Sequence, residues 1–287
     1  MDIETSGAIR LFFPNPSLTL VYFEALANAL DAGATDVSID IDVQAFDKPD
    51  TLTITVSDNG DGFTDENFDR FKTLLKPRDK FHKGIGRLVF LNYFNRVEVV
   101  STWDRWQRTF TFKEGFDGNA PLQNIEQAQA AKTALTFTGF TGTRVKSYDD
   151  LKPDAIKPLL IEQFLPTLDA RKRDGKSFKI SVVLKTNESN AQKEFLPEMT
   201  KITIQDDTLD AISTIDMHYH IAPVSGKGSS LVAFSIDGRT IPANLIPPSS
   251  FPPGYLCVFL FESELFHSNA DSSRRNARGS SLSRSAS

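Results

Sequence analysis

Cysteine is nearly absent from this sequence, which contains one in 287 residues, together with only four histidines. The single cysteine, Cys257, cannot form a disulfide within the chain, and no group of cysteines and histidines has the spacing of a zinc site. Disulfides are typical of oxidising compartments. We therefore expect a reducing, cytoplasmic setting and no metal centre built from cysteine and histidine.

Long apolar runs are missing as well. No stretch reaches the roughly 18 apolar residues of a membrane-spanning helix, and the first residues, MDIETSGAIR, lack the basic segment and apolar run of a secretion signal. We expect neither membrane insertion nor secretion. The net charge of -5 argues against a surface that is basic throughout and coats nucleic acid, but it leaves a local basic patch open.

The material for folded cores is present, since 40% of the residues are hydrophobic and 24% are charged, as in ordinary globular proteins. The chain is longer than one core usually requires, so we predict two domains. Pro153 and Pro158 flank a new helical region after a series of strands, which puts the boundary near Tyr148. The predicted domains are residues 1–148 and 149–270, and the basic, serine- and arginine-rich stretch 271–287 is expected to be a disordered tail.

The first domain has the pattern of an α+β fold. Apolar residues recur at helical spacing from Leu18 to Leu30, and shorter helices are predicted near residues 67–74 and 87–94. Many strands with polar or glycine-rich loops indicate a mixed sheet covered by helices on one face, rather than alternating strand–helix units. The strands, predicted from alternating apolar and polar residues, are 36–43, 51–58, 96–102, 106–112, 133–139 and 143–148.

The second domain is predicted to be a smaller α+β unit. Its strands are expected at 178–184, 201–205, 230–238 and 255–261, after a helix over about 156–168. His218 and His220 alternate on another expected strand and share one face of it, but no carboxylate or cysteine partner is evident in the sequence. A metal site at these histidines is therefore not expected.

Three polar residues interrupt the apolar pattern of the first helix. Glu24, Asn28 and Asp31 are spaced so that they project from one helix face. An asparagine oxygen beside carboxylates suits magnesium, and the glutamate is placed to orient or deprotonate a water. By spacing alone, an ordinary solvated face is the favoured explanation of these three residues.

A glycine-rich turn, DNGDGF, follows the second predicted strand. Asp58 ends that strand, while Gly60 and Gly62 permit close approaches that a side chain would block. A carboxylate in this place accepts a hydrogen bond from an exocyclic amine such as that of adenine. The alternative is an ordinary turn, because Asn-Gly and Asp-Gly are frequent turn dipeptides.

A second glycine motif, KGIGR, precedes an apolar helix. Backbone N–H groups at a helix start, with Lys83 and Arg87 beside them, attract phosphates. The alternative is a glycine-hinged loop before a buried helix. Neither the Walker pattern nor GxGxxG is present, so P-loop and Rossmann sites are not indicated.

The order of these motifs is more specific than any one of them. EALANALDAGA, DNGDGF, KGIGR and TGTRV follow one another, each on the type of element expected for it. The N-terminal half resembles the GHKL ATPases, whose members include gyrase B, heat-shock-ninety chaperones, MutL, MORC proteins and sensor histidine kinases. The resemblance implies a Bergerat-fold sandwich that binds ATP with Mg²⁺, followed by a transducer-like domain.

The resemblance also implies a role for each matching residue. Glu24 matches the base that activates the attacking water, Asn28 matches the magnesium ligand, and Asp31 matches the acidic residue that closes the same motif. Asp58 matches the aspartate that reads adenine. The base pocket would be completed by Gly60, Gly62 and, through water, Thr143, and the phosphate loop would comprise Lys83, Gly84, Ile85, Gly86 and Arg87, preceded by an ATP lid over residues 74–83.

The second half resembles MutL-like transducer domains over a short stretch, SIDGRTI, at Ser235–Ile241. Such domains direct a basic residue towards the γ-phosphate, and Lys227, Arg274 and Arg275 are candidates. For each of them, an ordinary solvated basic residue is the favoured alternative, because the resemblance in this half is short. KGIGRLVFL differs from the corresponding MutL loop, so the resemblance does not select mismatch repair over other branches.

From these features we expect a slow, Mg²⁺-dependent ATPase that forms an ATP-dependent homodimer and couples nucleotide state to a protein or nucleic-acid partner. One alternative is a nucleotide-dependent scaffold or chaperone-like module that holds ATP without appreciable hydrolysis. A more remote alternative is phosphotransfer of the histidine-kinase type. Phosphotransfer is disfavoured because the first predicted helix, near residue 18, already belongs to the ATP-binding domain, and no phospho-accepting histidine helix is predicted ahead of it.

Overall fold

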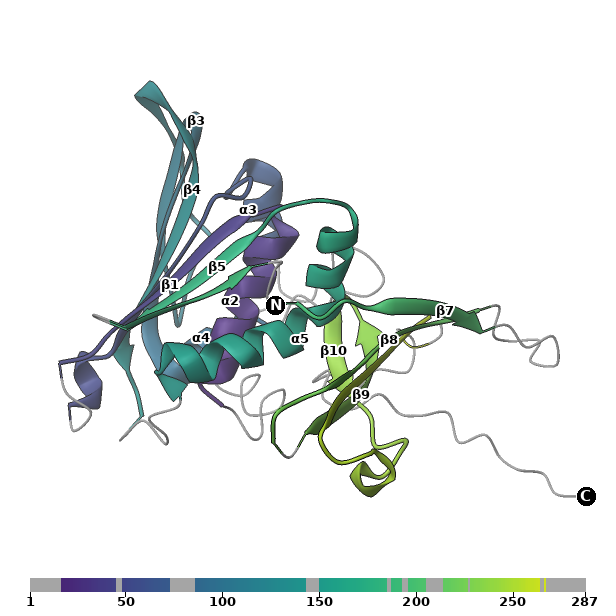
Figure 1. Ribbon diagram of the computed structural model, residues 1–287. Helices are drawn as coiled ribbons and strands as arrows, with labels where there is room; N and C mark the ends of the chain where they lie inside the picture. The colour runs from purple at the N-terminus through teal and green to yellow at the C-terminus, as the bar shows by residue number, and fades with distance from the viewer. Residues whose placement is uncertain are drawn as a thin grey trace, which may run out of the picture. The chain divides into compact units, whose positions relative to one another are not determined.

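The computed structural model describes residues 17–44, 48–72, 86–142, 150–184, 187–192, 196–204, 214–226, 228–263 and 266 (Figure 1). These residues form two compact units, divided within one helix. The first unit takes the described residues up to Ile161 and those from Gly175 to Gln192. The second takes Glu162–Asp174 and the described residues from Leu196 onward. Within the described residues, no helix has the length and apolar composition needed to cross a membrane.

A six-stranded mixed sheet organises the first unit, in the order β3-β4-β2-β1-β5-β6. Neighbouring strands are antiparallel except for β1 and β5, which are parallel. The predicted mixed sheet is therefore confirmed. The strands are β1 (Asp36–Asp42), β2 (Thr53–Asp58), β3 (Phe94–Lys113), β4 (Leu122–Phe140), β5 (Lys179–Leu184) and β6 (Asn187–Gln192).

The alternation in β1 and β2 explains why one face of this sheet is covered. Val37, Ile39 and Ile41 of β1 are buried, and the polar residues between them are more exposed. Helix α2 (Thr19–Asp31) packs its apolar residues, Leu26 among them, against β1 and β2. The described residues of this region also form η1 (Pro49–Thr51), α3 (Asp65–Lys72) and α4 (Leu88–Tyr93).

Strands β3 and β4 form a hairpin that extends well beyond the rest of the sheet (Figure 1). The alternation predicted two separate strands at 96–102 and 106–112, but they are continuous in β3, with register shifts around Asp104. Asp104 has a φ of 49°, which marks the irregularity. The prediction also missed the first half of β4, because LQNIEQAQAAK has little apolar alternation.

The second unit contains a five-stranded sheet in the order β10-β9-β11-β8-β7. Its strands are β7 (Thr200–Ile204), β8 (Ile215–Pro223), β9 (Ser229–Ile236), β10 (Arg239–Pro242) and β11 (Tyr255–Glu262), and η4 (Pro248–Ser250) precedes β11. Asp237 and Gly238 make the two-residue turn between β9 and β10, with φ values of 52° and 71°. The Thr167 hydroxyl of helix α5 (Pro153–Arg173) donates to Gly238 O at 2.9 Å, which ties this turn to the helix.

The division between the units differs from the boundary predicted after residue 148. The segment 178–184 was expected in the second domain, but β5 pairs in parallel with β1 from Asp36↔Lys179 to Ile41↔Leu184. The first unit also includes α5 up to Ile161. Buried Ile180 and Val182 explain this placement, because their side chains extend the apolar face that β1 begins.

Candidate functional site

Helix α2 and the loop before α4 meet at Glu24 and Gly86. A Cβ atom built on Gly86 would lie 1.8 Å from Oε2 of Glu24, so an alanine at this position would require the Glu24 side chain or the loop to move. The Glu24 carboxylate therefore lies directly against the backbone of the glycine motif. Asn28 and Asp31, which lie on the same helix face, are exposed, whereas Glu24 is partly buried.

Asp58 ends β2 and is 8% exposed. Its Oδ1 accepts a hydrogen bond from the Gly60 N–H at 2.9 Å. Burial raises the pKa of the Asp58 carboxyl above its ordinary value of 3.8, and the hydrogen bond from Gly60 acts in the opposite direction. A buried carboxylate has two acceptor oxygens, so Asp58 is suited to accept a further hydrogen bond from a ligand.

The two glycines of DNGDGF lie in places that exclude a side chain. A Cβ on Gly60 would approach Ala32 O to 2.7 Å, and a Cβ on Gly62 would approach Ser101 Oγ to 2.6 Å. Gly62 also has a φ of 75°, which L residues rarely adopt. Both glycines therefore keep the backbone close to its neighbours beside Asp58.

A row of polar side chains crosses three strands next to Asp58. Thr133 of β4 is opposite Asp58 of β2 on one side and opposite Ser101 of β3 on the other. The hydroxyls of Thr133 and Ser101 are 2.9 Å apart and buried. Sequence reasoning missed Thr133, because strand register decides which residue faces Asp58. The only hint in the sequence was that Thr133 begins the strand predicted over residues 133–139.

Arg87 follows Gly86 and is 9% exposed, although its predicted role was at the phosphates. Its guanidinium carbon lies 5.0 Å from the centre of the Phe71 ring. Burial lowers the pKa of Arg87 to about 10. Among the described residues, Nη2 of Arg87 has no hydrogen-bond partner. A buried cation with a donor left over is suited to hold an anion.

Several predicted site residues lie outside the described part of the chain. They are Lys83, Gly84, Ile85, Thr143, Lys227, Arg274 and Arg275, together with the lid predicted over 74–83. Their predicted roles therefore stay predictions.

His218 of the second unit has the carboxylate neighbours that the sequence did not reveal. Its Nδ1 is 3.9 Å from Asp169 and its Nε2 is 3.5 Å from Glu262. The nearby His218 lowers the pKa of the Glu262 carboxyl. These residues come from α5, β8 and β11, far apart in sequence. Within the described residues, no cluster of histidine, cysteine and acidic side chains is arranged to hold a metal ion.

Residues 15–105 match the family described as histidine kinase-, DNA gyrase B-, and HSP90-like ATPase. This region belongs to the GHKL superfamily. The matched range contains Glu24, Asp58 and Gly86. The predicted Bergerat-type α+β fold is confirmed.

Solved structures share the fold over most of the chain. A crystal structure of the N-terminal domain of a DNA repair protein is 14% identical and covers 96% of this chain and 90% of its own, with a TM-score of 0.58. The B subunit of the DNA gyrase from Myxococcus xanthus is 12% identical and covers 85% of this chain and 79% of its own, with a TM-score of 0.51. At such identities the GHKL fold is shared, and nothing further follows. No curated protein sequence matches the chain.

Proposed function

We propose that this protein binds ATP with Mg²⁺ and hydrolyses it slowly, and that its nucleotide state gates dimerisation. The proposal rests on one observation above all: the Glu24 carboxylate lies against Gly86, at the motif predicted to receive the phosphates. A carboxylate beside a phosphate-binding backbone would repel the phosphates. Its presence there is explained if it activates a water molecule or interacts with a bound metal ion. The GHKL family match over residues 15–105 supports the same conclusion.

The adenine end of the site is assigned to Asp58. Its second carboxylate oxygen would accept a hydrogen bond from the exocyclic amine, and Gly62 would line the pocket. We propose Thr133 as a further pocket residue, since it lies opposite Asp58 in the β2–β4 register. Thr133 is thus a candidate among the described residues, in addition to Thr143, which was predicted from the sequence.

The phosphate end is assigned to Gly86 and Arg87, together with the predicted Lys83, Gly84 and Ile85. The unpartnered Nη2 of Arg87 supports this assignment, because an anion would satisfy a donor that burial has removed from water. An anion would also offset the cost of burying the guanidinium, which is visible in its lowered pKa.

Asn28 is assigned to Mg²⁺. Its side-chain oxygen is a hard ligand, it is exposed, and it lies one helical turn from Glu24. Magnesium bound with a nucleotide typically uses one or two protein ligands and otherwise phosphates and water, so a single asparagine fits. When bound, the ion would offset the negative charge of the phosphates. Asp31, on the same face, would add negative charge nearby.

Glu24 is then the catalytic residue. Its carboxylate would accept a hydrogen bond from a water molecule, hold that water in line with the γ-phosphate, and take up its proton as the bond to phosphorus forms. Such positioning and proton transfer accelerate hydrolysis by about 10²- to 10⁴-fold. If Glu24 did not activate water, the chain would be a module that binds the nucleotide without hydrolysing it.

The second unit is proposed to transmit the nucleotide state to a dimer partner or a larger assembly. Helix α5 supplies residues to both units, so one continuous element carries both. Lys227, Arg274 and Arg275 remain candidates for the residue that approaches the γ-phosphate.

The test is calorimetric titration with ATP, paired with molar mass in solution without nucleotide, with ADP and with a non-hydrolysable ATP analogue. The wild type should bind ATP, and the analogue alone should double its mass. Asp58→Asn should weaken ATP binding to a lower but still measurable affinity and abolish the change in mass, because the carboxylate that reads the amine is lost. A wild-type protein that ignores adenine nucleotides would refute the proposed function, while binding without a change in mass would refute the dimerisation gate alone.

A further inference from the structure

The loop after Asp58 is held from two sides. On the first side, the α2–β1 connection provides the contacts: Asn59 Oδ1 accepts the N–H groups of Thr35 at 2.8 Å and Asp36 at 2.9 Å. The Asp61 N–H also donates to Ala32 O at 2.9 Å. These contacts fix the first half of DNGDGF, including the position of Asp58.

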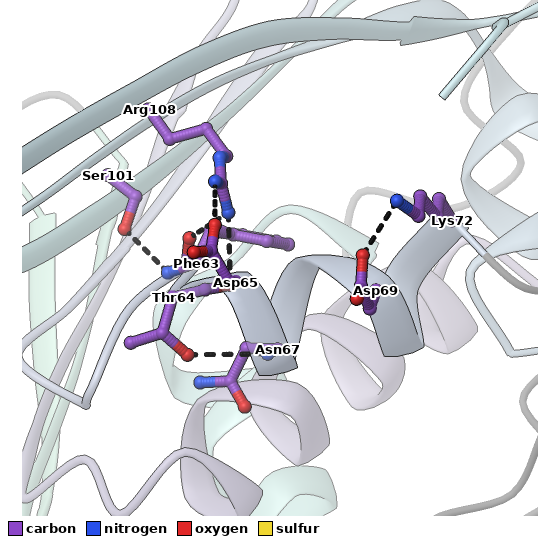
Figure 2. A network of polar contacts seen from close by, with 8 residues as sticks. All are labelled: Phe63, Thr64, Asp65, Asn67, Asp69, Lys72, Ser101 and Arg108. Carbon is purple, nitrogen blue, oxygen red and sulfur yellow. Dashed lines mark hydrogen bonds and ion pairs between the residues drawn. The ribbon is translucent and has the colours of Figure 1, made fainter. Parts of the chain in front are cut away.

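On the second side, two side chains of strand β3 form hydrogen bonds with the backbone of Phe63, as Figure 2 shows. The Phe63 N–H donates to Ser101 Oγ at 2.9 Å. The Phe63 carbonyl accepts from Arg108 Nη1 at 2.7 Å. Both polar groups of this one residue are therefore held by side chains of the same strand.

Arg108 reaches further along the loop. Nη1 also donates to Thr64 O at 3.0 Å, and Nη2 pairs with the Asp65 carboxylate. Helix α3 begins at Asp65, directly after Thr64, whose Oγ1 accepts the Asn67 N–H at 3.3 Å (Figure 2). One guanidinium thus holds the end of the loop and the first turn of the following helix.

Burial gives these contacts their strength. Arg108 is 3% exposed, and its guanidinium carbon lies 4.6 Å from the centre of the Phe68 ring. A buried guanidinium loses water on all sides, so moving away from the loop carbonyls would leave its donors unpaired. Nε of Arg108 already has no hydrogen-bond partner among the described residues, so the loop carbonyls carry most of its hydrogen bonding.

We propose that Arg108 and Ser101 are positioning residues for the adenine pocket. Gly62, adjacent to Phe63, lies so close to Ser101 that a Cβ would be 2.6 Å from Oγ. Ser101 in turn contacts the Thr133 hydroxyl at 2.9 Å, in the row that includes Asp58. Arg108 and Ser101 together form a clamp on Phe63. This clamp keeps Gly62 against the row and so sets the space and the hydrogen-bonding partners that distinguish one purine from another. This inference rests on the proposed binding of ATP.

The test compares the affinities for ATP and ITP, which share ribose and triphosphate but differ at position 6 of the purine, where only ATP has an amine. Arg108→Lys keeps the charge but loses the paired donors. We expect it to weaken ATP binding about tenfold, with ITP binding changed much less, so that the preference for ATP falls. Ser101→Ala should lower the same preference without altering any charge.

Arg96→Lys is the matched control. Arg96 lies on the same strand, but its side chain is 55% exposed, and its contacts among the described residues are with Thr138 and Glu98 at the surface. The ATP-to-ITP ratio of this variant should equal that of the wild type.

The outcomes separate the clamp from the proposed function. An unchanged ATP-to-ITP ratio in folded Arg108→Lys, or equal losses for both nucleotides, would overturn the clamp and leave ATP binding intact. If Arg108→Lys fails to fold, Ser101→Ala decides in the same way. A wild type that binds neither nucleotide would instead refute the proposed function.

Discussion

Glu24 Oε2 occupies the space that a side chain on residue 86 would need, at 1.8 Å from the position of its Cβ. The general base proposed from α2 and the glycine of the phosphate motif therefore depend on each other. This dependence can be tested, because Gly86→Ala adds a methyl group to the space between the two residues, whereas Glu24→Ala removes the carboxylate that fills it.

Gly86→Ala should abolish ATP hydrolysis and weaken nucleotide binding, because the methyl group displaces Glu24 or the loop. Adding Glu24→Ala should restore binding but not hydrolysis, since it removes the clashing atoms together with the base. Titration calorimetry and phosphate release measure the two properties separately. Additive losses in the double variant would show that the two residues do not share this space.

Glu24→Gln should retain ATP binding and lose about 10²-fold or more of the hydrolysis rate. Glutamine has nearly the same shape and still accepts a hydrogen bond from water, but it cannot take up the proton. Single-turnover phosphate release and ATP affinity are the measurements. Hydrolysis at the wild-type rate would remove the catalytic assignment.

Asp58 should make ATP affinity depend on pH. Burial raises its pKa above 3.8, and protonation removes the acceptor for the adenine amine. Affinity is thus highest well above the raised pKa and falls as the pH is lowered through it. Asp58→Asn serves as the control at each pH, because the ratio of the two affinities cancels the titration of the phosphates. A ratio that stays constant down to pH 3.8 would contradict the role of Asp58.

Gly62→Ala and Gly115→Ala separate backbone strain from collision. Their φ values are 75° and 72°, but a Cβ on Gly115 meets nothing within 4 Å, whereas one on Gly62 meets Ser101 Oγ. Gly115→Ala should cost about 1–2 kcal/mol of unfolding free energy from strain alone. Gly62→Ala should cost more and should also weaken ATP binding. Urea unfolding measures both variants, and equal costs would argue against the close contact with Ser101.

Glu262 should give the second unit a weak acid sensitivity. Its pKa in the folded protein lies below 4.5, chiefly because His218 Nε2 lies 3.5 Å from its carboxylate. The stabilisation is therefore complete above pH 4.5 and is lost as the pH falls through the lowered pKa. Since half of the Glu262 side chain is exposed, we expect less than about 1 kcal/mol. Glu262→Gln should remove this component from the pH dependence of urea unfolding, and an identical profile would exclude the His218 contact as its cause.

Much of the site was predictable because its parts are local. Glu24, Asn28 and Asp31 share a helix face by spacing alone, and Asp58 ends a strand whose alternation is plain. Gly60 and Gly62 belong to a turn whose composition is itself the signal. Arg87 was predicted beside the phosphates, but its stacking on Phe71 and its burial depend on α3 and are not encoded near residue 87.

The sequence by itself determined the periodic elements, the order of the motifs and hence the GHKL fold, because helix and strand periodicities depend on neighbours a few residues apart. Only the tertiary structure decided that β5 joins β1, that Thr133 faces Asp58, that Arg108 grips Phe63 and that His218 meets two carboxylates. Each of these depends on strand register or on packing between segments far apart in the chain. A shift of one residue in register would put a different side chain in the pocket, and no local pattern specifies that choice.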